Sequence, residues 1–269
     1  MSNVVRPEIG PRLDNRTALV TGAGQGLGRA IALCFARSGA DVVVNDLDGE
    51  RAAQTVGEIA AEGGTALAVP GDVSSEFDVE RLVGAAVERF GRLDIACNNA
   101  IPPVRLGPMH ELDVDDARAL AAVAMLGTAI CLKHQIRTMR TGGGGSIVNI
   151  SSTASVRGQE STGFYAGCKA AIEAMTRVAA GENGRFQIRV NAVQAGGMMT
   201  PALRQILEGS EGARERIEGG VPLGHVAEPD EVADVALFLA SDLARYVTGA
   251  VVTADGGGML HASSMPVRG

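Results

Sequence analysis

The chain has 269 residues, of which 46% are hydrophobic and 20% charged, and its formal net charge is -7 at pH 7. This length fits one α/β domain with a full core, and the acidic balance without a cluster of Lys and Arg argues against nucleic-acid binding, which needs a basic surface. No uninterrupted apolar run reaches the roughly 20 residues that a membrane-spanning helix needs, so we expect no membrane partner.

The N-terminal residues and the cysteine pattern bear on the compartment. Neither a basic patch nor a signal-like apolar stretch occurs in MSNVVRPEIGPRL, so we expect a soluble, cytoplasmic protein. The four cysteines and four histidines lack the spacing of a zinc site or a redox dithiol. We therefore expect free thiols and no catalytic metal.

Short β-rich runs alternate along the chain with longer, Ala-rich amphipathic segments, which is typical of parallel strands joined by helical crossovers. Strands are expected at residues 17–21, 41–45, 65–69, 93–97, 146–150, 187–193 and 250–253. Helices are expected at residues 26–38, 49–62, 75–90, 113–139, 162–180 and 229–240. Left-handed helix exits are expected at Gly39, Gly63 and Gly91, and Pro229 suits a first helical position. Residues 141–145 are expected to form a flexible turn, and residues 1–12 and 259–269 to be loosely ordered tails of one domain spanning 1–269.

A glycine-rich turn follows the first expected strand and leads directly into a helix, the order that a dinucleotide site requires. A missing Cβ lets the backbone approach a pyrophosphate, whose charge the free N–H groups and the helix dipole favour. The spacing departs from G-x-G-x-x-G, since Leu27 stands where the third glycine counted from Gly22 falls. The alternative is an ordinary tight turn. We assign to cofactor binding the turn residues Gly22, Gln25, Gly26, Leu27 and Gly28.

The second expected strand ends at Asp46, twenty residues after Gly26. A carboxylate here can accept hydrogen bonds from the ribose hydroxyls of adenosine, and it repels a 2′-phosphate. Neither Gln25 nor Leu47 offers a positive charge to reverse that preference, although Arg51 lies within reach. NAD is thus favoured over NADP, with Asp46 and Leu47 beside the ribose. The alternative is that Asp46 only solubilises a strand end.

A serine, a tyrosine and a lysine form the candidate catalytic set. Tyr165 follows Ser152 by thirteen residues, and Lys169 comes four residues later on the same expected helix face. A tyrosine near its reference pKa of about 10 is a poor base at neutral pH, whereas a neighbouring ammonium lowers the pKa by favouring the phenolate. Tyr165 is then able to exchange a proton with an alcohol.

From residue 17 to residue 257, the chain resembles the short-chain dehydrogenase/reductase family. Matching blocks occur in order: TGAGQGLG at the turn, Asp72 with Val73, NNA ending at Ala100, Ser152, YAGCK from Tyr165 to Lys169, RVNAV from Arg189 and YVTG from Tyr246. The resemblance implies an α/β fold of the single-domain Rossmann type, with a doubly wound parallel sheet of about seven strands and helices on both faces.

The resemblance also implies residue roles. Tyr165 is expected to be the general acid/base, Lys169 to lower its pKa and hold the nicotinamide ribose, and Ser152 to hydrogen-bond the substrate oxygen. Further cofactor contacts are expected from Asp72 and Val73 at the adenine, Asn99 and Ala100 in the cofactor cleft, and Met198 and Thr200 at the carboxamide end. Singly, each has a plain alternative: Ser152 caps a strand end, Lys169 is a solvated helix residue, and Thr200 caps a helix beginning at Pro201.

Ala124 stands where the family usually has an asparagine, three residues before Gly127. In the family, that asparagine kinks the helix, and its main-chain carbonyl holds a water that passes protons to the lysine. If the bend in the helix is kept here, the water can remain. If the helix straightens, proton transfer to the lysine through that water is impaired. Two further departures are Ile101 in place of a glycine, and Gln194-Ala195 in place of the usual Ala-Pro.

The sequence therefore predicts an NAD-dependent oxidoreductase, with an NAD-binding protein of impaired turnover as the alternative and a module without cofactor as a third reading. Substrate walls are expected from residues 101–110 and 198–222, which are rich in Pro, Met and Leu, so an apolar secondary alcohol or ketone is suggested. Small side chains on the helix of Tyr165 permit close helix approach, which fits family members that form dimers or tetramers. A homotetramer or homodimer is expected.

Overall fold

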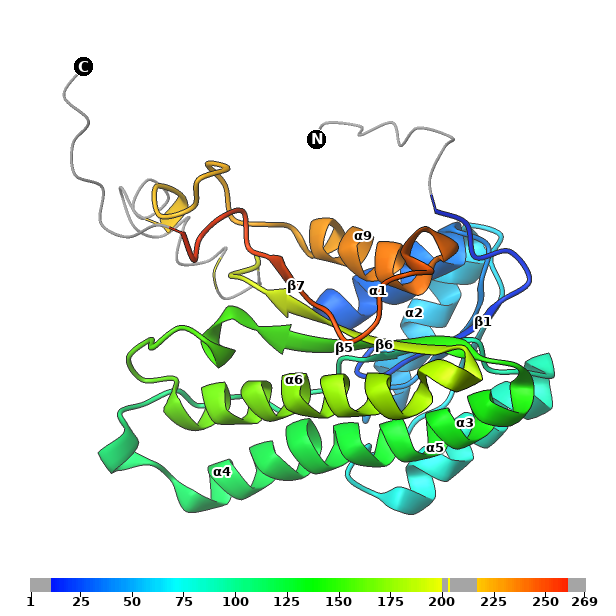
Figure 1. Cartoon of the computed structure of the whole chain (residues 1–269), viewed down its shortest axis with the longest axis horizontal. Coiled ribbons are helices and arrows are strands. Elements are labelled where there is room, and N and C mark those ends of the chain that lie inside the picture. The colour runs from blue at the N-terminus through cyan, green and yellow to red at the C-terminus, as the bar shows by residue number, and fades with distance from the viewer. Residues whose placement is uncertain (1–10, 200–202, 204–216, 261–269) are drawn as a thin grey trace.

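The computed structural model describes residues 11–199, 203 and 217–260, which form a parallel sheet covered by helices on both faces (Figure 1). The sheet has seven strands in the order β3-β2-β1-β4-β5-β6-β7, and every neighbouring pair is parallel. The strands are β1 (Thr17–Val20), β2 (Asp41–Val44), β3 (Ala66–Ala68), β4 (Ile95–Asn98), β5 (Gly145–Ser152), β6 (Ile188–Ala195) and β7 (Val251–Ala254).

The helices form one layer on each face of the sheet. One layer holds α1 (Gly26–Arg37), α2 (Gly49–Ala61) and α9 (Pro229–Ala240), and the other holds α3 (Glu76–Phe90), α4 (Val114–Leu120), α5 (Thr128–Gly142) and α6 (Gly163–Asn183) (Figure 1). Short 3-10 turns lie at Met109–Glu111, Thr153–Ser155, Gly184–Phe186 and Asp242–Ala244. The doubly wound α/β fold class expected from the sequence is confirmed.

Local signals place the helix ends as expected. Gly39, Gly63 and Gly91 have φ of 100°, 82° and 81°, the left-handed conformation that ends a helix without a side-chain clash. Pro229 is the first residue of α9. The turn expected at 141–145 is too long, because α5 continues to Gly142 and β5 begins at Gly145. β5 and β6 also extend beyond their expected ends, since they pair with each other as far as Ser152 and Ala195.

The run Val114–Gly142 is one 29-residue helical segment, in which a seven-residue π-helical turn, Ala121–Gly127, separates α4 from α5. By length and composition alone this segment meets the criterion for a membrane-spanning helix, although charged residues interrupt its apolar run. In the fold, α5 packs against α3 and α6 on one face of the sheet.

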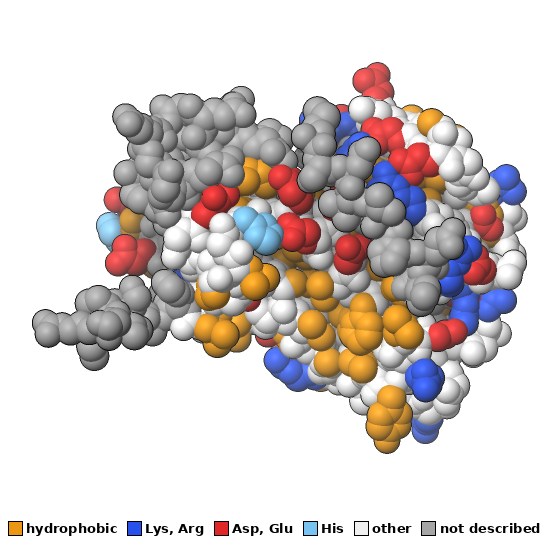
Figure 2. Space-filling view, turned by 90° about the horizontal axis from the view of Figure 1, so that it is seen from above, with side chains coloured by type: hydrophobic (Ala, Val, Ile, Leu, Met, Phe, Trp, Pro, Cys, Tyr) orange, Lys and Arg blue, Asp and Glu red, His pale blue; other side chains and the backbone are white. Residues whose placement is uncertain are grey.

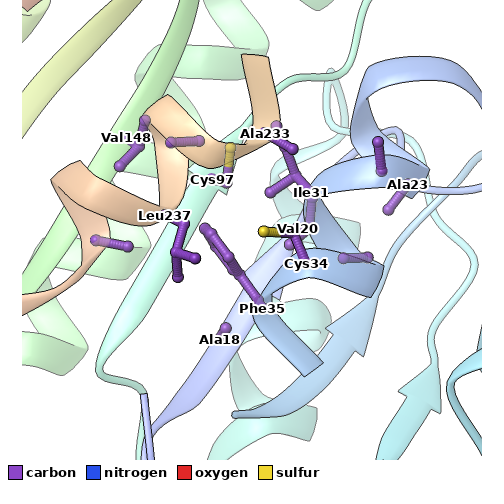
Figure 3. Close-up of a cluster of buried hydrophobic side chains, with 14 of the residues drawn as sticks. Ala18, Val20, Ala23, Ile31, Cys34, Phe35, Cys97, Val148, Ala233 and Leu237 are labelled. Carbon is purple, nitrogen blue, oxygen red and sulfur yellow. The ribbon is translucent and has the colours of Figure 1, made fainter. Parts of the chain in front are cut away.

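The largest core cluster lies between the sheet and the α1–α9 layer (Figure 3). Ile31 and Phe35 of α1 meet Leu237 of α9 over the sheet, and Cys34 and Cys97 fill space among them. All four cysteines are buried and none forms a disulfide.

Figure 2 looks onto the α9 side of the molecule, where hydrophobic side chains gather on the surface. Phe238 of α9 and Leu243 of the turn after it are exposed.

The strand order determines where a ligand can bind. The chain runs outward from β1 to β3 and then crosses back to β4 on the other side of β1. Loops after β1 and β4 therefore diverge and leave a crevice at the carboxyl ends of these strands, the usual ligand position in open α/β sheets. Of the residues singled out from the sequence, Asp46 follows β2 and Ser152 ends β5, so both lie at this edge. Of the expected tails, residues 1–10 and 261–269 lie outside the described residues.

Candidate active site

The turn between β1 and α1 brings backbone close to backbone. Gly22 and Gly26 have φ of 61° and 55°, and a Cβ built on Gly28 would lie only 2.1 Å from the carbonyl oxygen of Gly22. Any side chain at Gly28 would therefore open the turn. Gln25 precedes α1 and its side chain makes no capping hydrogen bond to the first helical turn. This narrow, uncapped helix start fits a phosphate-bearing ligand. Leu27, by contrast, is buried in the core cluster.

The turn is braced from the end of β4. The Asn99 amide nitrogen donates to the carbonyl oxygens of Thr21 and Gly22, each at 3.1 Å. The backbone N–H groups of Asn99 and Ala100 both donate to the Thr21 hydroxyl, at 3.0 and 3.2 Å. Asn99 and Ala100 thus hold the glycine turn in shape from beside it. Thr21 was not singled out from the sequence, and only its place at the end of the first strand signalled such a role.

Asp46 lies directly over the glycine turn. Its Oδ2 accepts a hydrogen bond from the Gly24 backbone N–H at 2.9 Å, and its Oδ1 accepts one from the Asp48 N–H at 3.1 Å. Two backbone donors hold the carboxylate in place, so its negative charge is fixed at the carboxyl end of β2. Leu47 is largely exposed beside it. Arg51 is paired with Asp48 at 3.2 Å.

The segment after β3 is held beside the same crevice. The Asn45 amide donates to the carbonyl oxygens of Val69 and Gly71 at 3.1 and 3.0 Å. Asp72 accepts hydrogen bonds from both the backbone N–H and the hydroxyl of Ser74, each at 2.8 Å. Val73 is buried in a cluster with the partly buried Ala100. The structure thus brings the two residues expected at the adenine next to those expected in the cofactor cleft.

Ser152, Tyr165 and Lys169 come together at the end of β5. Ser152 is the last residue of that strand, and α6 carries the other two. The Ser152 side chain lies next to the phenol of Tyr165, close enough to act on its pKa. The Lys169 Nζ donates to the Ile150 carbonyl oxygen at 2.8 Å and lies 5.8 Å from the centre of the Tyr165 ring. Lys169 is only 4% exposed, which removes the alternative of a solvated helix residue.

Burial dominates the acid–base behaviour of this group. It raises the pKa of Tyr165 above its ordinary value, and hydrogen bonding with Ser152 opposes that shift. Burial also lowers the pKa of Lys169 to about 8. The sequence predicted a lowered pKa for Tyr165, and in the protein alone the direction is the opposite. The reason is that the Lys169 ammonium points to the Ile150 carbonyl, so desolvation of the phenolate is the larger effect.

Ala124 lies within the π-helical turn, so this helix is not regular where the family asparagine is expected. Its carbonyl oxygen accepts a hydrogen bond from the Thr128 hydroxyl at 2.7 Å. The Ala124 side chain is buried with Cys168 and packs against the partly buried Phe164 and Tyr165. The local departure from α-helical geometry therefore persists without the asparagine side chain.

A cavity of about 410 Å³ opens beside Tyr165. Its apolar walls include Pro103, Val104, Leu106, Met109, Leu120 and Phe164. The loop at 101–110 thus lines the cavity as expected. The lining is more charged than the sequence suggested. Arg105 adds one cation, and three carboxylates come from the 3-10 turn, the N-cap of α4 and α4 itself: Glu111, Asp113 and Asp116.

The segment after β6 is described only in part. Met198 is half-buried and pairs with Ala227 in an isolated parallel bridge. Thr200 and most of the second expected substrate wall lie outside the described residues.

A buried chain of amides between the sheet and the α5–α6 layer was missed from the sequence. Asn98 exchanges hydrogen bonds with Gln135 at 3.0 and 2.7 Å and donates to Asn149 at 2.9 Å. Asn149 in turn donates to the Thr176 hydroxyl at 2.9 Å. These bonds tie β4, α5, β5 and α6 together beneath the crevice. Asn98 belongs to the NNA block, but its partners come from distant segments.

Comparisons with known proteins agree with this geometry. Residues 22–259 match the family model described as enoyl-(acyl carrier protein) reductase. A short chain dehydrogenase/reductase of Aspergillus oryzae is 42% identical, covering 91% of this chain and 95% of its own. A 2,5-dichloro-2,5-cyclohexadiene-1,4-diol dehydrogenase of Sphingobium indicum is 40% identical, covering 91% and 97%.

Solved structures show the same fold. A 7α-hydroxysteroid dehydrogenase complexed with NADH and 7-oxo glycochenodeoxycholic acid has a TM-score of 0.85 and 33% identity, covering 92% of this chain and 95% of its own. A gluconate 5-dehydrogenase from Burkholderia cenocepacia, in complex with NADP and tartrate, has a TM-score of 0.86 and 31% identity, covering 93% and 98%. The chain belongs to the short-chain dehydrogenase/reductase family, whose members here are oxidoreductases that use nicotinamide cofactors.

Proposed function

We propose that this protein is an NAD-dependent oxidoreductase that interconverts an apolar secondary alcohol and its ketone, with Tyr165 as the general acid/base. The observation that carries the proposal is the proximity of Ser152 and Lys169 to Tyr165, which itself lines a cavity, on the sheet edge that also holds the glycine turn. A panel of secondary alcohols with NAD, followed at the absorbance of the reduced nicotinamide, tests it. No turnover with any alcohol or ketone, in either direction, would contradict it.

The side chains divide the work at the substrate oxygen. The nicotinamide ring, when bound, supplies or accepts the hydride at the substrate carbon. Tyr165 donates its phenolic proton to the oxygen during reduction and takes it back during oxidation. Ser152, which lies next to Tyr165, gives that oxygen a second polar partner. Lys169 is buried below them, close enough for its ammonium to stabilise the phenolate once the Ile150 contact is exchanged.

Three sets of residues are proposed to hold the cofactor. The uncapped start of α1 and the close approach at Gly28 suit the pyrophosphate. Val73 and Ala100, with Asp72 and Asn99, flank the adenine side. Asp46 favours NAD, because its fixed negative charge meets the ribose and repels a 2′-phosphate. One structural neighbour is complexed with NADH and another with NADP, so the choice at this chain rests on Asp46.

An alicyclic secondary alcohol is the proposed substrate class. The cavity beside Tyr165 has a volume of about 410 Å³ and walls of Pro, Val, Leu, Met and Phe, which suit a carbocycle. The relative from Sphingobium indicum is named for a cyclohexadiene diol, and a structural neighbour holds a steroid acid. The acidic rim from Glu111, Asp113 and Asp116 suits hydroxyl groups, which donate hydrogen bonds to carboxylates.

Ala124 favours a second candidate function, an NAD-binding protein with impaired turnover. Against it stands the π-helical turn, which keeps the helix irregular at this position. We therefore expect Ala124→Asn to change kcat by less than roughly threefold. Because Ala124 is only 1% exposed, the larger side chain overpacks the site and lowers stability by about 1–3 kcal/mol.

Steady-state kinetics and thermal unfolding of Ala124→Asn check this prediction. Ala119→Asn, at an exposed position of α4, is the matched control for the helix propensity of asparagine. A gain in kcat of more than roughly tenfold in Ala124→Asn would favour the impaired-turnover function.

The buried lysine predicts a pH dependence of stability. Its pKa is about 8 in the folded protein and about 10.4 in an unfolded chain, so the unfolded state binds more protons between these values. Stability contributed by this group therefore rises with pH, by about 2 kcal/mol between about pH 7 and about pH 9.5. Denaturant unfolding of wild type and Lys169→Met at both pH values measures the difference. Lys133→Met, which removes an exposed lysine and leaves Lys169 in place, is the control and should keep the wild-type gain, whereas Lys169→Met should lose it.

A homo-oligomer and a cytoplasmic location remain part of the proposal. α4, the π-helical turn and α6 expose the apolar side chains of Val114, Leu126 and Val178, and α6 is the helix of Tyr165, at which close helix approach is expected. Light scattering after gel filtration measures the mass, and a monomer at micromolar concentration would contradict the assembly.

A further inference from the structure

A buried carboxylate lies behind the candidate catalytic side chains, on the same helix. Glu173 follows Lys169 by four residues and Tyr165 by eight, and it is only 3% exposed. Its Oε1 is within hydrogen-bonding distance of three side-chain donors: the Ser151 hydroxyl at 2.7 Å, the Gln194 amide at 2.9 Å and the Ser155 hydroxyl. Its Oε2 faces Arg177 at 3.5 Å. A buried carboxylate is expensive unless it is satisfied in this way.

The three donors come from three different elements of the fold. Ser151 lies in β5, directly before Ser152. Ser155 lies in the 3-10 turn that follows, and its hydroxyl is also within 2.7 Å of the Ser152 carbonyl oxygen. Gln194 lies near the end of β6. One carboxylate oxygen therefore ties the chain on both sides of Ser152, and the end of β6, to the helix that carries Tyr165.

Gln194 extends this connection across the sheet. Its amide nitrogen also donates to the Ser155 hydroxyl at 2.9 Å, and its Oε1 accepts from the Thr253 hydroxyl of β7 at 3.0 Å. Gln194 and Ala195 stand where the family resemblance leads us to expect Ala-Pro. A proline would stiffen the chain through its fixed φ. In this chain the side-chain hydrogen bonds of Gln194 restrain the end of β6, where the family has the proline.

We propose that Glu173 and Gln194 are positioning residues that set the distance between Ser152 and Tyr165. The inference rests on the proposed oxidoreductase function. Glu173 anchors the segment 151–155, here called the Ser152 turn, to α6. Gln194 anchors the end of β6 to this turn through Ser155 and to α6 through Glu173. Without these bonds Ser155 and the end of β6 lose their hydrogen bonds to α6, and the bonds of Lys169 to Ile150 and Ser151 remain there. The glycine turn and Asp46 at the other side of the crevice keep their contacts.

The variants Glu173→Leu, Glu173→Gln and Gln194→Leu test the proposal. Glu173→Leu removes the acceptor, whereas Glu173→Gln keeps a carbonyl oxygen able to accept from the same donors. Thr176→Val is the matched control, because Thr176 is fully buried on α6. The substitution removes a comparable side-chain hydrogen bond from Asn149, and also the bond from the Thr176 hydroxyl to the Ile172 carbonyl oxygen.

In steady-state kinetics we expect Glu173→Leu and Gln194→Leu to lower kcat by roughly 10- to 100-fold, with KM for NAD within roughly threefold of wild type. Glu173→Gln should recover kcat to within roughly fivefold, and Thr176→Val should keep it. If the substitutions acted only by lowering stability, kcat would fall by a similar factor in all four variants. Wild-type kcat in folded Glu173→Leu and Gln194→Leu, or an equal loss in Thr176→Val, would overturn the proposal.

Amide hydrogen exchange gives a readout that does not depend on turnover. Exchange in residues 151–156 should be faster in Gln194→Leu than in Glu173→Gln and Thr176→Val. This measurement stands even if Glu173→Leu fails to fold or the wild type turns over no substrate. An inactive wild type would refute the proposed function, whereas unchanged exchange at 151–156 would refute the positioning role.

Discussion

Tyr165→Phe is expected to lower kcat by roughly 10²- to 10⁴-fold, the usual contribution of a positioned general acid/base. The substitution removes only the phenolic oxygen, which lies against Ser152 at the wall of the cavity. The ring still packs with Phe164 and Ala124, so the fold should be unchanged. NAD affinity should change by less than roughly threefold, because the glycine turn and Asp46 are untouched. Kinetics and calorimetric titration with NAD measure the two effects.

The chain supplies its own control for this substitution. Tyr246 is the only other tyrosine and is fully exposed, so Tyr246→Phe should leave kcat unchanged. Retained turnover in Tyr165→Phe would remove Tyr165 from the reaction. Equal losses in both variants would show that the effect is not local to the cavity.

Asp46→Asn is expected to shift the ratio of kcat/KM for NADP to that for NAD upward by roughly 10- to 100-fold, equivalent to about 1.4–2.7 kcal/mol. The amide keeps an oxygen to accept from the Gly24 N–H, but it removes the charge that repels a 2′-phosphate. Arg51 lies close by, held by Asp48, and can then meet the added phosphate. Initial rates with both cofactors at a saturating alcohol concentration measure the ratio.

The matched control for Asp46→Asn is Glu50→Gln, which removes one negative charge from the exposed start of α2. If only the overall charge of this region mattered, both variants would shift the ratio alike. A ratio that stays at the wild-type value in Asp46→Asn would place the source of cofactor preference elsewhere.

Much of the fold followed from local patterns. The alternation of apolar strands with amphipathic helices predicted seven strands and their order along the chain, and the glycine exits at Gly39, Gly63 and Gly91 were correct because each depends on backbone conformation at one residue. Strand ends were less accurate. Ser152 and Ala195 continue their strands because each pairs with the other, a contact between segments more than forty residues apart.

The candidate site divides in the same way. The glycine turn, Asp46 and the pair Tyr165 and Lys169 stand out in the sequence because their chemistry requires fixed residue types at short spacings. Glu173 did not stand out, although the four-residue step from Lys169 placed it on the same helix face. Its significance comes from Ser151, Ser155 and Gln194, which reach it from other strands and turns.

The sequence by itself determined the fold class, the family resemblance and the residues that line the sheet edge, since these depend on local periodicity and on motifs of neighbouring residues. Only the tertiary structure decided three further properties. Burial raises the pKa of Tyr165 in the protein alone, the helix at Ala124 keeps a π-helical turn, and carboxylates from residues 111–116 charge the rim of the cavity. All three depend on desolvation and packing between segments far apart in the chain, which residue spacing does not encode.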